Sequence, residues 1–227
     1  MPTSRLQRRN VDSENDDIVF SSQVPEMIFQ HMTEARKYHI LDLGPPVQEN
    51  VTLFSGQNIR HYIDDLQSSL DVFSETLIDV DASDISSHCF GAKEFAQFLP
   101  YSADTRFDVI LLWDLPNYLN EQSIEALVSH LGQYCRRGAL LYFLVYIHKE
   151  MPIRPSRMHF QNLEQVVYYP RLPIEECSPR YTPKHLEKMM SGFTIYRLYL
   201  LGNGLQEHVF RFEKPLDRPN LTIIGNR

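Results

Sequence analysis

The run Phe107–Trp113 constrains the fold more than any other part of this sequence, because all but one of its residues are apolar. A second run, Ala139–Ile147, is apolar throughout. A strand can be apolar on both of its faces only where both faces are covered, which is typical of parallel sheets between helical layers. The two runs therefore predict central strands of a covered sheet.

Shorter signals on either side alternate between strand and helix. The predicted strands are His39–Leu43, Ile59–Ile63, Phe107–Trp113, Ala139–Ile147, Thr194–Leu201 and His208–Phe212. The first predicted helix begins at Pro25, and the last begins at Pro183, with Thr182 as its N-cap. Between them, the predicted helices are Val47–Phe54, Leu66–Phe73, Ala92–Phe98 and Glu121–Arg136. This order predicts an α/β fold with a mixed sheet, helices on both faces and a terminal antiparallel hairpin turning at Gly202-Asn203-Gly204.

The domain organisation follows from where these signals stop. Residues 1–20 are polar and charge-segregated and are expected to form a flexible N-terminal tail, and residues 21–215 a single domain. His148–Arg180 is expected to be loop-rich because it holds five prolines. Residues 216–227 form a C-terminal tail in which Leu221–Ile224 could add an edge strand.

Composition narrows the class of partner. The chain has 22 Lys and Arg against 29 Asp and Glu, a net charge of -7, so general binding to nucleic acid or to an anionic membrane is not expected, although a local basic groove stays possible. No apolar run approaches the ~20 residues of a membrane span. The three cysteines are far apart and the nine histidines are scattered, so no metal site is predicted and a cytoplasmic protein is expected.

Acidic residues gather where the predicted strands end. The first strand ends at Asp42 and Gly44, the second at Asp64-Asp65, 22 residues after Asp42, and the third at Asp114. Ligands of open α/β sheets bind beyond the carboxyl ends of the strands. An acid about 20 residues after a glycine turn is well placed to accept hydrogen bonds from ribose hydroxyls.

At these positions the chain resembles the class I S-adenosylmethionine-dependent methyltransferases over roughly Met27–Phe212. The similar segments are Ile40–Gly44, Asp64 or Asp65, Phe107–Asp114 with Tyr118-Leu119, Arg137–Leu141, Tyr181–Pro183 with Leu186, and Ser191–Phe193. The resemblance implies a Rossmann-like, seven-stranded sheet with its last strand antiparallel, and S-adenosylmethionine as cofactor. It would place Asp42 and Gly44 at the donor's methionine end, Asp64 or Asp65 at the ribose, and Asp114 near the sulfonium.

The glycine motif departs from the family pattern, since Pro46 and Gln48 stand where two further glycines are usual. Proline fixes φ and adds a ring where bare backbone would meet the ligand. The third-strand acid that often contacts adenine is not identifiable in Ser86–Phe98. The first hypothesis is a methyltransferase for an unidentified acceptor, and the alternative is a catalytically inactive methyltransferase-fold protein that serves as a binding or regulatory module.

Each acid also has a purely structural interpretation. Asp42, and the pair Asp64-Asp65, could stabilise the starts of the helices that follow them. Asp114 could belong to a turn that ends a buried strand, although Asp114–Tyr118 loosely resembles the amine-holding loop of amino-methyltransferases. The arginines of His148–Arg180, with Tyr168 and Tyr169, could grip an anionic or flat acceptor or could sit on a Pro-fixed surface loop. The acceptor, the general base, the oligomeric state and the pathway stay open.

Overall fold

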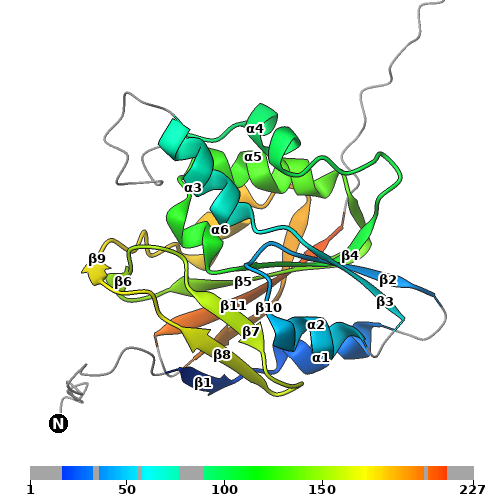
Figure 1. Ribbon diagram of the computed structural model, residues 1–227, viewed down its shortest axis with the longest axis horizontal. Coiled ribbons are helices and arrows are strands. Elements are labelled where there is room, and N and C mark those ends of the chain that lie inside the picture. The colour runs from blue at the N-terminus through cyan, green and yellow to red at the C-terminus, as the bar shows by residue number, and fades with distance from the viewer. Residues whose placement is uncertain (1–16, 33–35, 56–57, 77–88, 202–203, 214–227) are drawn as a thin grey trace, which may run out of the picture.

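A computed structural model describes residues 17–32, 36–55, 58–76, 89–201 and 204–213, and its centre is a mixed sheet (Figure 1). In spatial order the strands are β10 (Phe193–Leu200), β11 (Leu205–Phe212), β5 (Cys135–Tyr146), β4 (Phe107–Trp113), β2 (Tyr38–Asp42) and β3 (Ile59–Ile63). β2 runs parallel to β3 and β4, and β4 runs parallel to β5. β11 is antiparallel to both of its neighbours, β5 and β10. The fold is therefore α/β with a central mixed sheet.

Different layers cover the two faces of this sheet (Figure 1). One face carries α3 (Leu66–Thr76), α4 (Ala92–Phe98), α5 (Glu121–Gly132) and α6 (Pro183–Met189). The other carries α1 (Val24–His31) and α2 (Gln48–Ser55), beside a small antiparallel sheet of β1 (Ile18–Ser21), β8 (Gln165–Tyr169) and β7 (Arg157–Phe160). A two-stranded ribbon, β6 (Glu150–Pro152) with β9 (Ile174–Glu176), lies beyond one end of the main sheet.

The core explains why β4 is so apolar. All seven β4 residues are buried, and they alternate between two apolar clusters on opposite faces of the sheet. The polar exception, Asp108, is compensated at the amino end of the strand: its Oδ2 accepts from the His39 N–H (2.8 Å) and its Oδ1 from Arg36 (2.7 Å). A buried carboxylate needs such partners because desolvation alone would disfavour its charge.

The predicted strands Ile59–Ile63 and Phe107–Trp113 and the predicted helix Ala92–Phe98 have the expected bounds, and the others agree to within a few residues, with two exceptions. The helix expected over Glu121–Arg136 ends at Gly132, and β5 already begins at Cys135. Gly138, expected to end that helix, instead takes a left-handed conformation (φ 83°) inside β5.

The segment expected to be loop-rich, His148–Arg180, instead contains four strands, β6 to β9. Its prolines lie at strand ends or between strands, where they leave the pairing intact. Residues 18–20, inside the range expected to be a tail, belong to β1, which pairs with β8. The described residues supply six strands to the main sheet, whereas the resemblance implies seven.

Some expectations concern residues that the structure does not describe. These are the turn residues 202 and 203 and the edge strand Leu221–Ile224. No helix of the described residues is long and apolar enough to cross a membrane.

Candidate functional site

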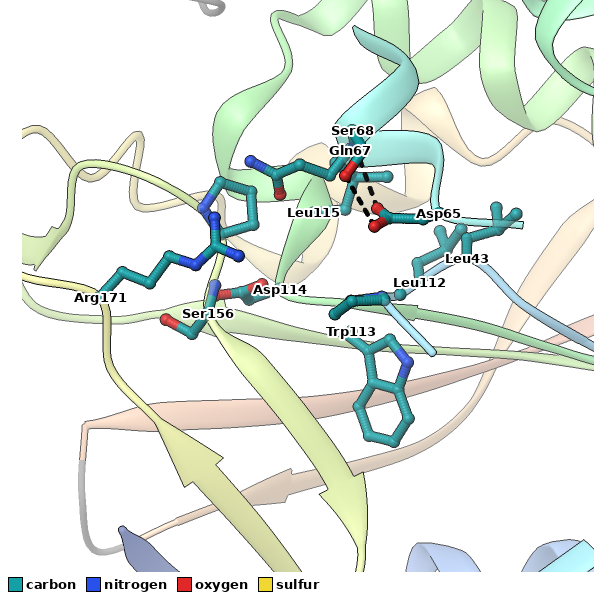
Figure 2. A pocket seen from close by; sticks show the side chains of 13 residues that line it. Leu43, Asp65, Gln67, Ser68, Leu112, Trp113, Asp114, Leu115, Ser156 and Arg171 are labelled. Atoms are coloured by element: carbon teal, nitrogen blue, oxygen red, sulfur yellow. Dashed lines mark hydrogen bonds between the residues drawn. The ribbon is translucent and has the colours of Figure 1, made fainter. Parts of the chain in front are cut away.

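A narrow cleft lies where β2 and β4 end, at the carboxyl edge of the sheet (Figure 2). Its walls come from the turn after β2, the first residues of α3, the end of β4 with the short 3-10 helix η2 (Leu115–Tyr118), and the segment between β6 and β7. Arg171, from the segment between β8 and β9, reaches toward it (Figure 2). The cavity volume is about 20 Å³, which is room for about one water molecule.

The turn after β2 is held from behind by Asp42, which is buried. Its Oδ1 accepts from the Gly44 N–H (3.1 Å) and from Trp113 Nε1 (2.7 Å), and its Oδ2 accepts from Asn50 Nδ2 (2.9 Å). Asn50 also accepts from the Phe160 N–H (3.0 Å). Asp42 thus connects the turn to β4, α2 and β7, and its side chain is not among those that line the cleft.

Trp113 occupies an unusual conformation for its size. Its φ of 52° lies in the left-handed region, where a bulky residue is strained. The indole points away from Asp65 and Ser68 (Figure 2). A Cβ added at Gly44 would come within 2.7 Å of the indole Cδ1. Position 44 therefore requires glycine because Trp113 already fills the space of a side chain.

The acid pair after β3 divides between two environments. Asp64 Oδ2 accepts from the Tyr101 hydroxyl (2.6 Å), and Asp64 does not line the cleft. Asp65 does line it, and it also accepts from the backbone N–H (3.0 Å) and the hydroxyl (2.7 Å) of Ser68. Asp65 thus stabilises the start of α3, as the structural interpretation of this acid expects, while facing the cleft.

Asp114 is a buried acid at the cleft wall. Its Oδ2 accepts from the Tyr146 hydroxyl (3.1 Å) and from the Ser156 N–H (3.0 Å). Burial outweighs these hydrogen bonds and raises the pKa of Asp114 to about 7. A carboxyl group with a pKa near neutrality can accept and release a proton under physiological conditions, which is the property required of a general base.

Hydrogen bonds of the Asn117 side chain hold the Asp114–Tyr118 segment in place. Asn117 Nδ2 donates to the carbonyls of Asp114 (2.7 Å) and Leu144 (2.8 Å), and its Oδ1 accepts from the Tyr146 N–H (3.1 Å). The segment is therefore a 3-10 turn that ties β4 to β5.

One buried polar atom at the cleft, Gln67 Nε2, has no hydrogen-bond partner within the described part of the chain. Leaving such an atom unpaired costs about 1–3 kcal/mol. A polar ligand that enters here would find one free donor.

Of the five predicted site residues, Gly44, Asp65 and Asp114 line the cleft, while Asp42 and Asp64 point elsewhere. Sequence reasoning missed Gln67 and Ser156, and it missed Trp113 as the partner of Asp42. No sequence signal marks these, because each depends on a contact between distant segments. The side chains of Pro46 and Gln48 are exposed and do not line the cleft, so it is not the two missing glycines that make it narrow.

The segment His148–Arg180 was expected either to contact an acceptor or to form a surface loop. Of its arginines, Arg171 lines the cleft and Arg154, Arg157 and Arg180 do not. Tyr168 binds the Tyr146 hydroxyl (2.9 Å), and Tyr169 stacks on His159. Within the described ranges, no group of three His, Cys, Asp or Glu side chains is arranged to hold a metal ion.

Comparison with known proteins gives likenesses among solved structures alone. No family model matches the chain, and no curated protein does. The 1,6-didemethyltoxoflavin-N1-methyltransferase of Burkholderia thailandensis, with bound 1,6-didemethyltoxoflavin and S-adenosylhomocysteine, is similar with 13% identity and a TM-score of 0.43, over 84% of this chain and 76% of that one. The glycopeptide N-methyltransferase MtfA, complexed with S-adenosylhomocysteine, has 15% identity and a TM-score of 0.43, over 82% and 87%. The N-methyltransferase NodS of Bradyrhizobium japonicum WM9 has 10% identity and a TM-score of 0.42, over 84% and 95%.

Proposed function

We propose that the cleft binds S-adenosylmethionine and that the chain is a methyltransferase for an unidentified acceptor. The observation that carries the proposal is the position and polarity of the cleft. It lies at the carboxyl edge of a sheet in which parallel β3, β2, β4 and β5 are followed by antiparallel β11. Its lining includes the carboxylate of Asp65, the buried acid Asp114, whose pKa is raised to about 7, and the unpartnered Gln67 Nε2.

The residues present suit the donor's polar groups. Asp65 offers carboxylate oxygens to the ribose hydroxyls, and the unpartnered Gln67 Nε2 can donate to a further polar atom. Gly44 presents backbone without a side chain on the opposite wall. The narrowness of the cleft requires that the lining move on binding, and exposed Arg171 can swing aside without disturbing the core.

S-adenosylmethionine would supply an electrophilic methyl group, and the chain would position the acceptor for displacement at that carbon. Asp114 is the residue best suited to take a proton from an acceptor. It lines the cleft, it is desolvated, and its pKa lies near the operating pH. Tyr146 and the Ser156 N–H hold the carboxyl in place.

The adjacent acids provide a matched test. Asp65→Ser keeps a side-chain oxygen that can cap α3 but removes the carboxylate, whereas Asp64→Ser alters an acid that faces Tyr101 instead of the cleft. We expect Asp65→Ser to weaken the binding of S-adenosylhomocysteine by roughly tenfold, the effect of losing hydrogen bonds to a charged group. Asp64→Ser should leave the affinity within about twofold, as expected of a residue without ligand contact. Equal effects of the two substitutions in calorimetry would contradict the role of Asp65.

The second candidate is a methyltransferase-fold binding or regulatory module without catalysis. The observation in its favour is the cavity volume of about 20 Å³, far below the roughly 300–1,000 Å³ of common ligand pockets. The absence of a response to S-adenosylhomocysteine at millimolar concentration would exclude the first candidate and favour this one.

A further inference from the structure

We propose that a second, larger cavity binds a small amphipathic amine with a mainly apolar body and one protonated nitrogen. The cavity has a volume of about 530 Å³, within the range of sites that hold drug-sized ligands. It shares no lining residue with the cleft described above. The proposal goes beyond the proposed function and does not depend on methyl transfer.

Three separate sheets enclose this cavity, which lies where β5 ends and β11 begins. The ribbon of β6 and β9 forms one wall, the edge of the small sheet at β1 and β8 forms another, and the main sheet closes the third side. In Figure 1 the labels β6 and β9 mark this end of the molecule. The apolar lining residues are Ile18, Met151, Pro152, Pro170, Ile174 and Leu205.

Some of this apolar lining is open to solvent, which suits an apolar ligand. Ile18 is 40% exposed and Ile174 is 50% exposed, whereas Met151 and Leu205 are buried deeper in the wall. Exposed aliphatic side chains around a hollow are typical of ligand-binding surfaces. A ligand that covers these side chains would remove apolar area from water, which favours binding by about 25 cal/mol per Å² of buried area.

Gly204 and His148 contact each other on one side of the cavity. The φ of Gly204, 83°, is left-handed, and a Cβ at this position would collide with the ring of His148. The His148 ring therefore lies directly on the Gly204 backbone, and both residues line the cavity.

Two hydroxyl groups belong to the polar part of the lining. The Tyr146 and Tyr168 hydroxyls share a hydrogen bond of 2.9 Å, and both residues line the cavity. A tyrosine oxygen accepts hydrogen bonds as well as donating one, so this wall is compatible with a ligand N–H.

The charged side chains of the lining favour a cationic ligand. The lining contains Lys149 against Glu150 and Glu176, so it carries one net negative charge. Glu150 and Glu176 are directly opposite each other in the β6–β9 ribbon, an arrangement in which like charges destabilise the pairing. Lys149 Nζ lies 4.0 Å from Glu176, and Glu150 has no ion pair within the described residues. An ammonium group beside Glu150 would supply the missing positive charge.

The test uses three compounds with one ring system: 2-naphthylmethylamine, the neutral 2-naphthylmethanol and the anionic 2-naphthoate. Binding to the full chain is measured by ligand-observed NMR titration. We expect the amine to bind at least roughly threefold more tightly than the alcohol, the contribution of one partly exposed charge pair. The carboxylate should bind most weakly. An amine that binds no more tightly than the alcohol would overturn the proposal.

Variants locate the site. Glu150→Gln should bring the amine's affinity down to that of the alcohol, while Glu125→Gln, the same change at an exposed position on α5, should have no effect. Ile174→Trp fills the cavity from a half-exposed position and should abolish binding of both compounds. Unchanged binding in Ile174→Trp would place the compounds elsewhere and refute the site. Titration with S-adenosylhomocysteine addresses the other cleft, so failure of one proposal leaves the other intact.

Discussion

Replacing Trp113 by phenylalanine tests whether the hydrogen bond behind the Gly44 turn stabilises the fold. Trp113 is 3% exposed, and its Nε1 donates to Asp42 Oδ1 at 2.7 Å. A hydrogen bond to a charged group contributes about 1.5–3 kcal/mol. The smaller ring also leaves a cavity among Tyr142 and Phe160, which contact the indole, at a cost of about 1–2 kcal/mol.

The free energy of unfolding should therefore fall by about 2.5–5 kcal/mol in Trp113→Phe. For a chain of this size that corresponds to a decrease in Tm of about 5–20 °C. Urea unfolding followed by circular dichroism is the suitable assay, because Trp113 is the single tryptophan and the variant lacks its fluorescence.

A double-mutant cycle with Asp42→Ala, which removes the acceptor of Trp113 Nε1, separates the hydrogen bond from the lost volume. The coupling free energy between the two substitutions should be about 1.5 kcal/mol or more, because the pair is buried and directly bonded. A coupling near zero, or a loss of stability below about 1 kcal/mol in Trp113→Phe, would refute the role assigned to this contact.

Three further predictions concern stability. The pKa of Asp114, about 7 in the folded chain, lies above its ordinary value of 3.8, so its contribution to stability is present at low pH and lost as the pH rises; between pH 5 and 8, urea titrations should show the native chain losing about 2–3 kcal/mol relative to Asp114→Asn. Burial lowers the pKa of His208 from 6.5 to about 4, so its contribution is lost as the pH falls; between pH 7 and 4.5 His208→Phe should avoid a loss of about 2 kcal/mol, and parallel pH profiles would contradict this. Thr182 accepts from the His185 N–H at the start of α6; Thr182→Ala should cost about 1 kcal/mol in thermal unfolding, and Thr182→Ser much less.

The sequence allowed much of the main sheet to be predicted, because its strands carry a local signal. Phe107–Trp113 is apolar on both faces, and a strand of that kind must lie between two layers wherever it is found. The helix behind Thr182 was equally predictable, since the cap and the following proline act within four residues.

The small sheet and the ribbon were not predictable in the same way. β7 and β8 are short strands in a proline-rich segment, and β8 pairs with β1 from the other end of the chain. The β8–β1 pairing joins residues more than 140 positions apart, such as Ser21 and Gln165, and it leaves only a weak local pattern.

The candidate site shows the same division between local and distant information. The positions of Gly44, Asp65 and Asp114 follow from the strand ends and were predicted. The orientation of Asp42 was not, because Trp113, 71 residues later, has to adopt a left-handed backbone to reach its carboxylate. Polar residues at strand ends therefore indicate the edge of the sheet at which the cleft lies, while distant contacts decide which of them line it.

Calorimetric titration of the full chain with S-adenosylhomocysteine tests the central claim most directly. If the cleft beside Gly44, Asp65 and Asp114 binds the methyl donor, the titration will show saturable one-to-one binding. A flat titration at millimolar ligand, with the chain folded, would contradict the proposed methyltransferase function.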